Sequence, residues 1–164
     1  MNCDICNEKL IPPSGPKTAS IGLMGEFPGW YEIEKETVFV GPTGDILKRE
    51  LAKQGISFMT CLATNLWGHA PNDDEAELSL HFSTAIRALK KCRAVFLMGS
   101  DVSQAVFGEN IMSISGMVME SDLFSNAEIV IAAPNPAVLA HGGLGEFRLA
   151  LGAFAQLCHK KRIL

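Results

Sequence analysis

The chain has 164 residues, of which 48% are hydrophobic and 20% charged, and its formal net charge is −4. This composition is typical of one globular domain rather than a disordered chain, and no apolar stretch approaches the ~20 residues that a membrane span needs. The negative charge argues against an extensive basic nucleic-acid surface, although it leaves room for a local basic patch.

The N-terminal segment MNCDICNEKL has neither the apolar core of a signal peptide nor Arg-rich transit character, so we expect a cytoplasmic protein. The chain has five cysteines, an odd number that in a reducing compartment favours thiols or a metal site over a disulfide framework. Cys3 and Cys6 have the Cys-x-x-Cys spacing of metal ligands, although a terminus without metal explains the pair too. We expect one domain over residues 1–164, with residues 1–17 as an N-terminal appendage.

Beyond this appendage, four apolar, β-rich segments alternate with segments of helical spacing. Strands are expected at Thr18–Met24, Ser57–Thr64, Ala94–Met98 and Glu128–Ala133. Helices are expected at Gly44–Gln54, Asp74–Lys91, Asp101–Gly108 and Gly145–Cys158. Continuous apolar strands separated by helices predict a parallel sheet that is covered on both faces. The predicted class is therefore α/β, a three-layer α/β/α sandwich around a mainly parallel four-stranded sheet.

Three polar side chains follow three of the predicted strands at or near their carboxyl ends. They are Glu26, Asn65 and Asn135. Ligands of such sheets bind beyond the carboxyl ends of the strands, so we expect these side chains to converge on one cleft. Each also has a simpler interpretation on its own, because Glu26 fits a solvated loop and the two asparagines fit turns.

The Gly-Pro-Thr-Gly segment at residues 41–44 lies just before a predicted helix. Helix N-termini bind phosphate through their exposed N–H groups. The spacing differs from that of a P-loop, and no Lys-Ser or Lys-Thr pair follows the second glycine. A plain helix cap is therefore the simpler interpretation of this segment alone.

Four segments occur in a fixed order: GEFPGWYEIEKETVFVGPTG, TNLWGHAPN, FLMGSDVSQAVFG and NPAVLA. From about residue 18 to residue 157 the chain resembles the uracil-DNA glycosylase superfamily. The branch that it resembles most is family 4, the iron–sulfur type, with its Gly-Glu-Ala-Pro-Gly and Pro-Phe-Val-Gly-x-Ala-Gly motifs. The resemblance implies a repair hydrolase that removes uracil, or a related or modified pyrimidine, from DNA and leaves an abasic site. No lysine lies in the pocket motifs to form a Schiff base, so we expect monofunctional chemistry.

The resemblance also implies roles for single residues. Glu26 would activate the attacking water, with Asn135 as the second catalytic residue. Phe39 would stack on the extruded base and Asn65 would hydrogen-bond its Watson–Crick edge, with Gly25 and Phe27 beside them. The backbone N–H groups of Gly41, Thr43 and Gly44 would contact DNA phosphates. The segment His141–Leu144 would form a wedge that enters the vacated base stack, with Leu144 at its tip.

Two departures from the family pattern weaken this assignment. Asn135 replaces the motif histidine and is a weaker and differently placed donor, although the mismatch-specific uracil/thymine glycosylases also have Asn-Pro here. Phe27 and Trp30 are bulky, and they either narrow, reshape or fill the pocket or point into the core. These departures favour the alternative of a weakly active or inactive DNA-binding or scaffold subunit. In both cases we expect a monomer that binds single- or double-stranded DNA, with replication or repair proteins as further partners.

The metal site departs from the family as well. Family 4 holds a four-iron cluster with four cysteines, and the resemblance aligns His69 and His81 with the third and fourth. Two cysteines and two histidines suit tetrahedral zinc, whereas two-His ligation of iron–sulfur centres is found on two-iron clusters. We therefore favour zinc, with an iron–sulfur cluster or no metal as alternatives. Cys61, Cys92 and Cys158 are expected to be structural.

Overall fold

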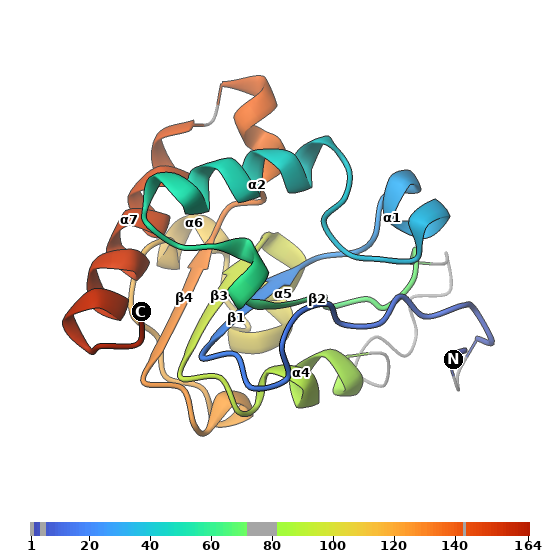
Figure 1. Cartoon of the computed structure of the whole chain (residues 1–164), viewed down its shortest axis with the longest axis horizontal. Coiled ribbons are helices and arrows are strands. Elements are labelled where there is room, and N and C mark those ends of the chain that lie inside the picture. The colour runs from blue at the N-terminus through green and yellow to red at the C-terminus, as the bar shows by residue number, and fades with distance from the viewer. Residues whose placement is uncertain (1, 4–5, 72–81, 143) are drawn as a thin grey trace.

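The computed structural model describes residues 2–3, 6–71, 82–142 and 144–164. Within them, four strands form one sheet in the order β2–β1–β3–β4 (Figure 1). The strands are β1 (Ile21–Gly25), β2 (Leu62–Asn65), β3 (Ala94–Met98) and β4 (Ile129–Ala133). Every pairing between them is parallel, which confirms the predicted α/β class and makes the sheet parallel throughout.

Helices cover both faces of this sheet, as Figure 1 shows. The α-helices are α1 (Trp30–Lys35), α2 (Pro42–Lys53), α4 (Ser83–Leu89), α5 (Ser100–Phe107), α6 (Ile111–Ile114) and α7 (Leu144–Lys160). Short 3-10 helices are η1 (Phe58–Thr60), η3 (Asp122–Phe124) and η4 (Pro136–His141). None of the helices in the described ranges is long and apolar enough to cross a membrane.

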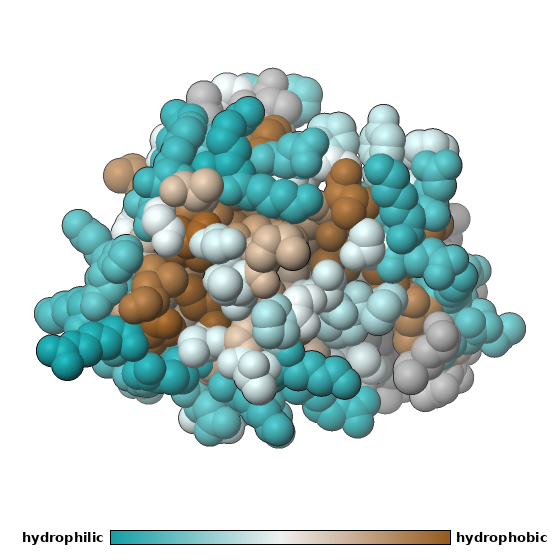
Figure 2. All heavy atoms as spheres, in the orientation of Figure 1, coloured by the Kyte–Doolittle hydropathy of each residue, from teal (hydrophilic) through white to brown (hydrophobic). Residues whose placement is uncertain are grey.

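Apart from Thr64 and Asn65 in β2, the strands are apolar because alternate side chains enter two separate cores. Leu23 and Phe96 pack with residues of α2 and α7 in one core. Met24 and Leu97 pack with residues of α4, α5 and α6 in the other. The three-layer arrangement expected from the sequence is therefore present. Figure 2 shows mostly polar side chains over the face seen in Figure 1, with apolar residues between them.

Several element boundaries differ from the predicted ones by one to five residues, and two of the differences have a clear local reason. The expected strand Ser57–Thr64 begins only at Leu62, because Thr60 closes a tight turn with its N–H and hydroxyl, both donating to the Ser57 carbonyl at 3.1 and 2.9 Å. The expected helix Gly44–Gln54 begins earlier, since Gly41 is the N-cap and Pro42 occupies the first helical position. The Gly-Pro-Thr-Gly segment is thus the first turn of α2.

Helices α1 and α6 were not predicted, because six and four residues are too few for a periodic pattern. Of the expected helix Asp74–Lys91, the structure describes α4, and residues 72–81 lie outside the described residues.

The N-terminal segment runs along the β2 edge of the sheet. Ser14 pairs with Ala63 in an antiparallel bridge, with both N–H···O bonds at 2.8 Å. The Ile11 N–H donates to the Gly68 carbonyl at 2.6 Å, and the Ile11 side chain is buried in the core that contains Leu23. The residues before β1 therefore support the loop that follows β2.

Candidate active site

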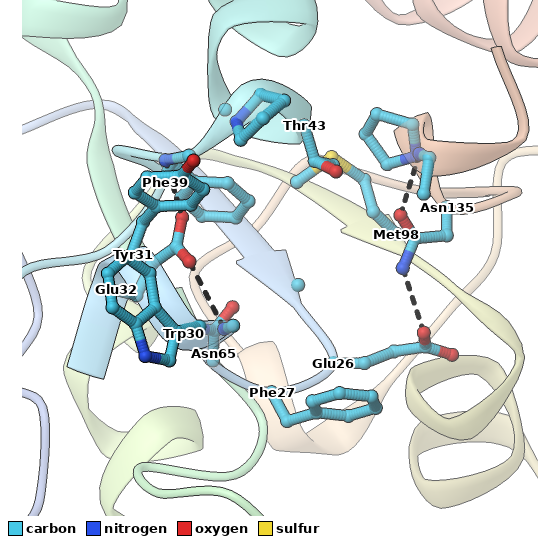
Figure 3. Close-up of a pocket in the computed structure, with 17 residues that line it drawn as sticks. Glu26, Phe27, Trp30, Tyr31, Glu32, Phe39, Thr43, Asn65, Met98 and Asn135 are labelled. Carbon is cyan, nitrogen blue, oxygen red and sulfur yellow. Dashed lines mark hydrogen bonds between the residues drawn. The ribbon is translucent and has the colours of Figure 1, made fainter. Parts of the chain in front are cut away.

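A pocket of about 300 Å³ opens at the carboxyl ends of the four strands. This volume is at the lower end of that found for small-molecule sites. Figure 3 shows Glu26 and Asn135 on one side of it and Asn65, Phe39 and Trp30 on the other. The three side chains expected to converge from separate strand ends do so.

Glu26 lies directly after β1, and both of its carboxylate oxygens accept a hydrogen bond. Oε1 accepts the backbone N–H of Asp101 at 3.0 Å, and Oε2 accepts Nδ2 of Asn135 at 2.9 Å. Asp101 is in the first turn of α5, so the carboxylate faces the positive end of that helix. These contacts hold the anion in one orientation and leave its other lone pairs for a ligand.

Gly99 makes this position of Glu26 possible. It lies between β3 and α5 with φ +117°, and a Cβ there would come within 2.3 Å of Glu26 Cδ. Only glycine combines that backbone conformation with that space. Gly99 follows the third predicted strand, but its contact with Glu26 depends on β1 and β3 being neighbours and was not predicted.

The side chain of Asn135 makes two hydrogen bonds, one with Ala137 and one with Glu26. Its Oδ1 accepts the Ala137 N–H at 2.9 Å, which caps η4 and fixes the orientation of the amide. Nδ2 therefore points towards Glu26, as Figure 3 shows, and one of its two hydrogens is used there. The residue that replaces the motif histidine thus contacts the residue expected to activate water.

Asn65 ends β2 on the opposite side of the pocket and is only 6% exposed. Its amide makes no side-chain hydrogen bond within the described part of the chain, so a donor and an acceptor are open to a ligand. Gly25 is its partner in the β1–β2 register, and a Cβ on Gly25 would lie 2.6 Å from Asn65 Oδ1 and 2.9 Å from Phe39 Cζ. Gly25 therefore leaves room for both side chains.

Phe39 is held in an unfavourable backbone conformation beside Asn65. Its φ is +55°, a region that non-glycine residues rarely adopt, and its ring packs edge-on against Phe58 at 6.0 Å between centroids. The backbone of Gly44 packs so closely that a Cβ there would lie 2.1 Å from the Phe39 carbonyl oxygen. Local strain of this kind is typical of functional sites. The buried Phe39 ring both lines the pocket and packs in the core that contains Leu23.

Glu32 is a pocket residue that the sequence did not reveal. Its carboxylate is almost buried and accepts three backbone N–H groups, from Gly29 at 3.1 Å, Val40 at 3.0 Å and Gly41 at 2.8 Å. These bonds join α1 to the loop that carries Phe39. Glu32 is in a helix too short to predict, although its position three residues after Gly29 is that of a capping-box glutamate.

The N-terminus of α2 also lines the pocket, but its N–H groups are not equally available. The Gly41 N–H donates to Glu32, so the phosphate contact expected of Gly41 is not open in this structure. The N–H groups of Thr43 and Gly44 have no acceptor among the described residues. A phosphate contact at this helix would therefore come from Thr43 and Gly44.

The bulky residues at the mouth of the pocket are exposed. Phe27, Trp30 and Tyr31 are 47%, 67% and 45% exposed, and all three line the pocket. The interpretation in which Phe27 and Trp30 point into the core is therefore wrong. Of the residues expected to form a wedge, His141 is exposed at the end of η4, whereas the side chain of Leu144 is outside the described part of the chain.

A second cluster of functional side chains lies away from the pocket. The ligand atoms of Cys3, Cys6 and His69 are within 4.8 Å of one another, and Cys6 Sγ is 3.3 Å from His69 Nε2. His69 Nδ1 lies 2.7 Å from the Ala70 carbonyl, which can only accept a hydrogen bond. Nδ1 therefore carries the proton, and Nε2 presents its lone pair to the two thiols. This donor set can hold a metal ion.

His81, the fourth ligand expected from the resemblance, lies outside the described residues. The other three cysteines are buried in the cores, and burial raises the pKa of Cys61 to about 12, of Cys92 to about 11 and of Cys158 to about 12. Burial in the cores thus makes these three thiols less reactive than exposed ones.

The parallel sheet and the pocket at its carboxyl edge, with a carboxylate and an amide on opposite sides, define an α/β protein with a candidate ligand site. A family model described as the uracil DNA glycosylase superfamily matches residues 12–155. The chain belongs to this superfamily. No curated protein matches the sequence closely enough to serve as a relative.

Proposed function

We propose that this chain is a monofunctional DNA glycosylase that hydrolyses the N-glycosidic bond of uracil or a related pyrimidine. The observation that carries the proposal is the Glu26 carboxylate, held by two donors across the pocket from the open amide of Asn65. Superfamily membership supports glycosylase chemistry and DNA binding.

In this proposal Glu26 orients a water molecule towards C1′ of the extruded nucleotide. As the bond between C1′ and the base breaks, its electron pair leaves with the base, and the sugar becomes positively charged. The carboxylate stabilises that charge and accepts a proton from the water, whose oxygen forms the new bond to C1′. The products are the free base and an abasic site. The second hydrogen of Asn135 Nδ2 is available to the departing base.

Recognition in this proposal is the task of the opposite wall. The Asn65 amide pairs with an acceptor and a donor on the edge of the base, and the Phe39 ring stacks on its face. Extruding a base costs a few kcal/mol, which these contacts offset. Because both residues are held by buried neighbours, they lose little conformational entropy when the base enters.

The test is release of uracil from oligonucleotides that carry it in single strands or opposite guanine or adenine. We expect Glu26→Gln to lower the single-turnover rate by about 10²- to 10⁴-fold while DNA affinity stays unchanged. The matched control is Glu109→Gln, which removes an exposed glutamate beyond the far end of α5. A parent protein that releases no uracil, or a Glu26→Gln variant as fast as the parent, would contradict the proposal.

An inactive scaffold is the less favoured alternative. An open pocket whose carboxylate is held by a specific donor pair argues for retained chemistry, since a scaffold has no use for that geometry. The Glu26→Gln comparison separates the two, because in a scaffold the substitution would change neither turnover nor DNA binding.

We further propose that this family 4-like chain holds zinc in place of the iron–sulfur cluster, through Cys3, Cys6 and His69, with His81 as the fourth ligand. Two thiolates and neutral imidazoles suit tetrahedral zinc. The bound ion would act as a structural cross-link. His69 ends the loop that follows Asn65, and in that loop the N–H groups of Leu66 and Trp67 donate to the Gly25 and Glu26 carbonyls at 2.8 and 2.9 Å. The cross-link would therefore stabilise the floor of the pocket.

Metal analysis of the purified protein tests the zinc proposal. We expect stoichiometric zinc that is lost in Cys6→Ser and retained in Cys92→Ser, the control for loss of a thiol elsewhere. The melting temperature should fall on chelation in the parent and not in Cys6→Ser. The assignment would be overturned if the protein contained iron and acid-labile sulfide. It would also be overturned if the protein contained no metal and chelators did not change its melting temperature.

A further inference from the structure

The mouth of the pocket carries three exposed aromatic residues that the proposed reaction does not use. Phe27 follows Glu26 directly, and Trp30 and Tyr31 begin α1. The Trp30 and Tyr31 rings meet edge to face, with centroids 5.0 Å apart and an interplanar angle of 81°. Figure 3 shows both rings beside Asn65 and Phe39, where the extruded base is proposed to bind.

Trp30 and Tyr31 lie on a helix that is tied to a neighbouring loop. Glu32, the next residue of α1, accepts N–H groups from Gly29, Val40 and Gly41, which ties the helix to the loop before α2. A ring that is fixed before binding loses little entropy when a ligand stacks on it.

The charges around the mouth point to bases rather than phosphates on this side. The two charged residues that line the pocket are Glu26 and Glu32, and no lysine or arginine lines it within the described chain. Helix α1 also carries Glu34 and Lys35, whose opposite charges cancel. Binding to duplex DNA depends on many phosphate contacts from basic side chains, whereas stacking on aromatic rings needs no positive charge.

We propose that Phe27, Trp30 and Tyr31 form a stacking platform for the unpaired bases next to the extruded nucleotide, and that the substrate is single-stranded DNA. In a duplex the neighbouring bases stay paired and stacked, so their faces are covered. In a single strand one neighbour can turn its face to the platform. The strand's phosphates then pass the N-terminus of α2, where the Thr43 and Gly44 N–H groups are open. This inference rests on the proposed glycosylase function for the choice of strand.

Tryptophan fluorescence tests the platform without requiring catalysis. Of the two tryptophans, Trp30 is 67% exposed and Trp67 is 5% exposed, so a base that stacks on the surface quenches Trp30. The probe is a uracil-free single-stranded oligonucleotide, compared with the same sequence as a duplex at the same salt concentration. We expect saturable quenching by the single strand and at least about tenfold weaker binding of the duplex.

Variants assign the effect to the platform. Trp30→Ala should abolish the quenching and weaken binding of a fluorescein-labelled single strand by about 5- to 100-fold, whereas Trp30→Phe should keep most of the affinity. Leu149→Ala is the matched control, because Leu149 is 76% exposed on α7 and does not line the pocket. Because Trp30 is exposed, we expect all three variants to fold, which circular dichroism and melting temperature verify.

The outcomes separate this inference from the function on which it rests. Quenching by single strands without uracil release would keep the platform and reject the glycosylase. Uracil release at equal rates from single strands and duplexes, unaffected by Trp30→Ala, would keep the glycosylase and reject the platform. Equal affinity for both DNA forms, or no binding of either, would also overturn the platform.

Discussion

The two walls of the pocket differ in what their polar groups contact. On the Glu26 wall both carboxylate oxygens have a protein donor, and Asn135 is fixed in turn by the Ala137 N–H. On the Asn65 wall the buried amide has no side-chain partner among the described residues. Because this amide lines the pocket, an entering base would replace water as its hydrogen-bond partner. In the proposed reaction the first wall is thus preorganised by protein donors, while the second is completed by its ligand.

The largest effect on the reaction is expected from filling the space that Glu26 occupies. Gly99→Ala puts a Cβ 2.3 Å from Glu26 Cδ at a φ of +117°, so the carboxylate must move off the N-terminus of α5. We expect the rate of uracil release to fall by about 10²- to 10⁴-fold, as for loss of the carboxylate itself. Single-turnover kinetics measure this change.

Gly108→Ala is the matched control for that substitution. Gly108 ends the same helix with φ +68°, and a Cβ there meets nothing within 4 Å. It should lose about 1 kcal/mol of folding free energy through backbone strain and keep the parent rate. If both variants were equally slow, helix strain rather than the position of Glu26 would explain the loss.

The opposite wall should respond in binding before it responds in chemistry. Asn65→Ala removes the only open donor–acceptor pair identified on this wall, so we expect about 10²-fold lower activity, with most of the loss in the affinity for uracil-containing DNA. Affinity for DNA with an abasic site should not change, because no base then enters the pocket. A loss that is equal for both DNAs would assign Asn65 to backbone or structural contacts instead.

A smaller effect is expected from the bond that joins Asn135 to Glu26. Asn135→Ser keeps an oxygen to cap η4 but loses the Nδ2 donor, so the carboxylate stays in place through the Asp101 N–H alone. We expect about a tenfold lower rate with nearly unchanged affinity and stability, the size of one hydrogen bond to a charged group. Asn135→Ala should be as slow and also about 1 kcal/mol less stable, since the cap is lost as well. Parent-like activity in the serine variant would show that this bond does not position Glu26.

The sequence sufficed to predict features that follow from one strand at a time. Continuous apolar runs predicted a sheet buried on both faces, and polar residues at strand ends predicted that Glu26, Asn65 and Asn135 would meet. The two hydrogen bonds of Glu26 could not be predicted from the sequence. Asp101 and Asn135 reach the carboxylate only because β1, β3 and β4 lie in their observed order.

Short elements were the other limit. Helix α1 has six residues, so its periodicity was invisible, and with it the role of Glu32 in holding the Phe39 loop. The Gly-Pro-Thr-Gly segment fitted both a phosphate loop and a helix cap, and only the geometry shows that Gly41 is already bonded to Glu32. The capping-box spacing of Gly29 and Glu32 was the signal in the sequence for the start of α1.

The smallest effect on the reaction is expected at a buried glutamate, Glu50, that joins α2 to α7 through Arg148. Glu50 is 2% exposed and accepts two bonds from Arg148, at 2.9 and 3.0 Å, and one from Lys53 at 2.8 Å. The Arg148 bonds lower the Glu50 pKa to about 2 despite burial, which acts in the opposite direction. Stability from this group is therefore complete above the ordinary pKa of about 4.5 and is lost as the pH falls from there to about 2.

We expect Glu50→Gln to lower the free energy of unfolding at pH 7 by about 1–3 kcal/mol, since the partners Arg148 and Lys53 are partly exposed. The variant should also lack the decline that this group gives the parent between about pH 4.5 and pH 2. Urea unfolding at several pH values measures both, with Glu109→Gln as the control for charge. The rate of uracil release at neutral pH should stay within about twofold of the parent, because neither pocket wall touches Glu50. A Glu50→Gln variant that folds but releases uracil much more slowly would contradict this expectation. It would mean that the N-terminus of α2, with Thr43 and Gly44, belongs to the preorganised wall of the pocket.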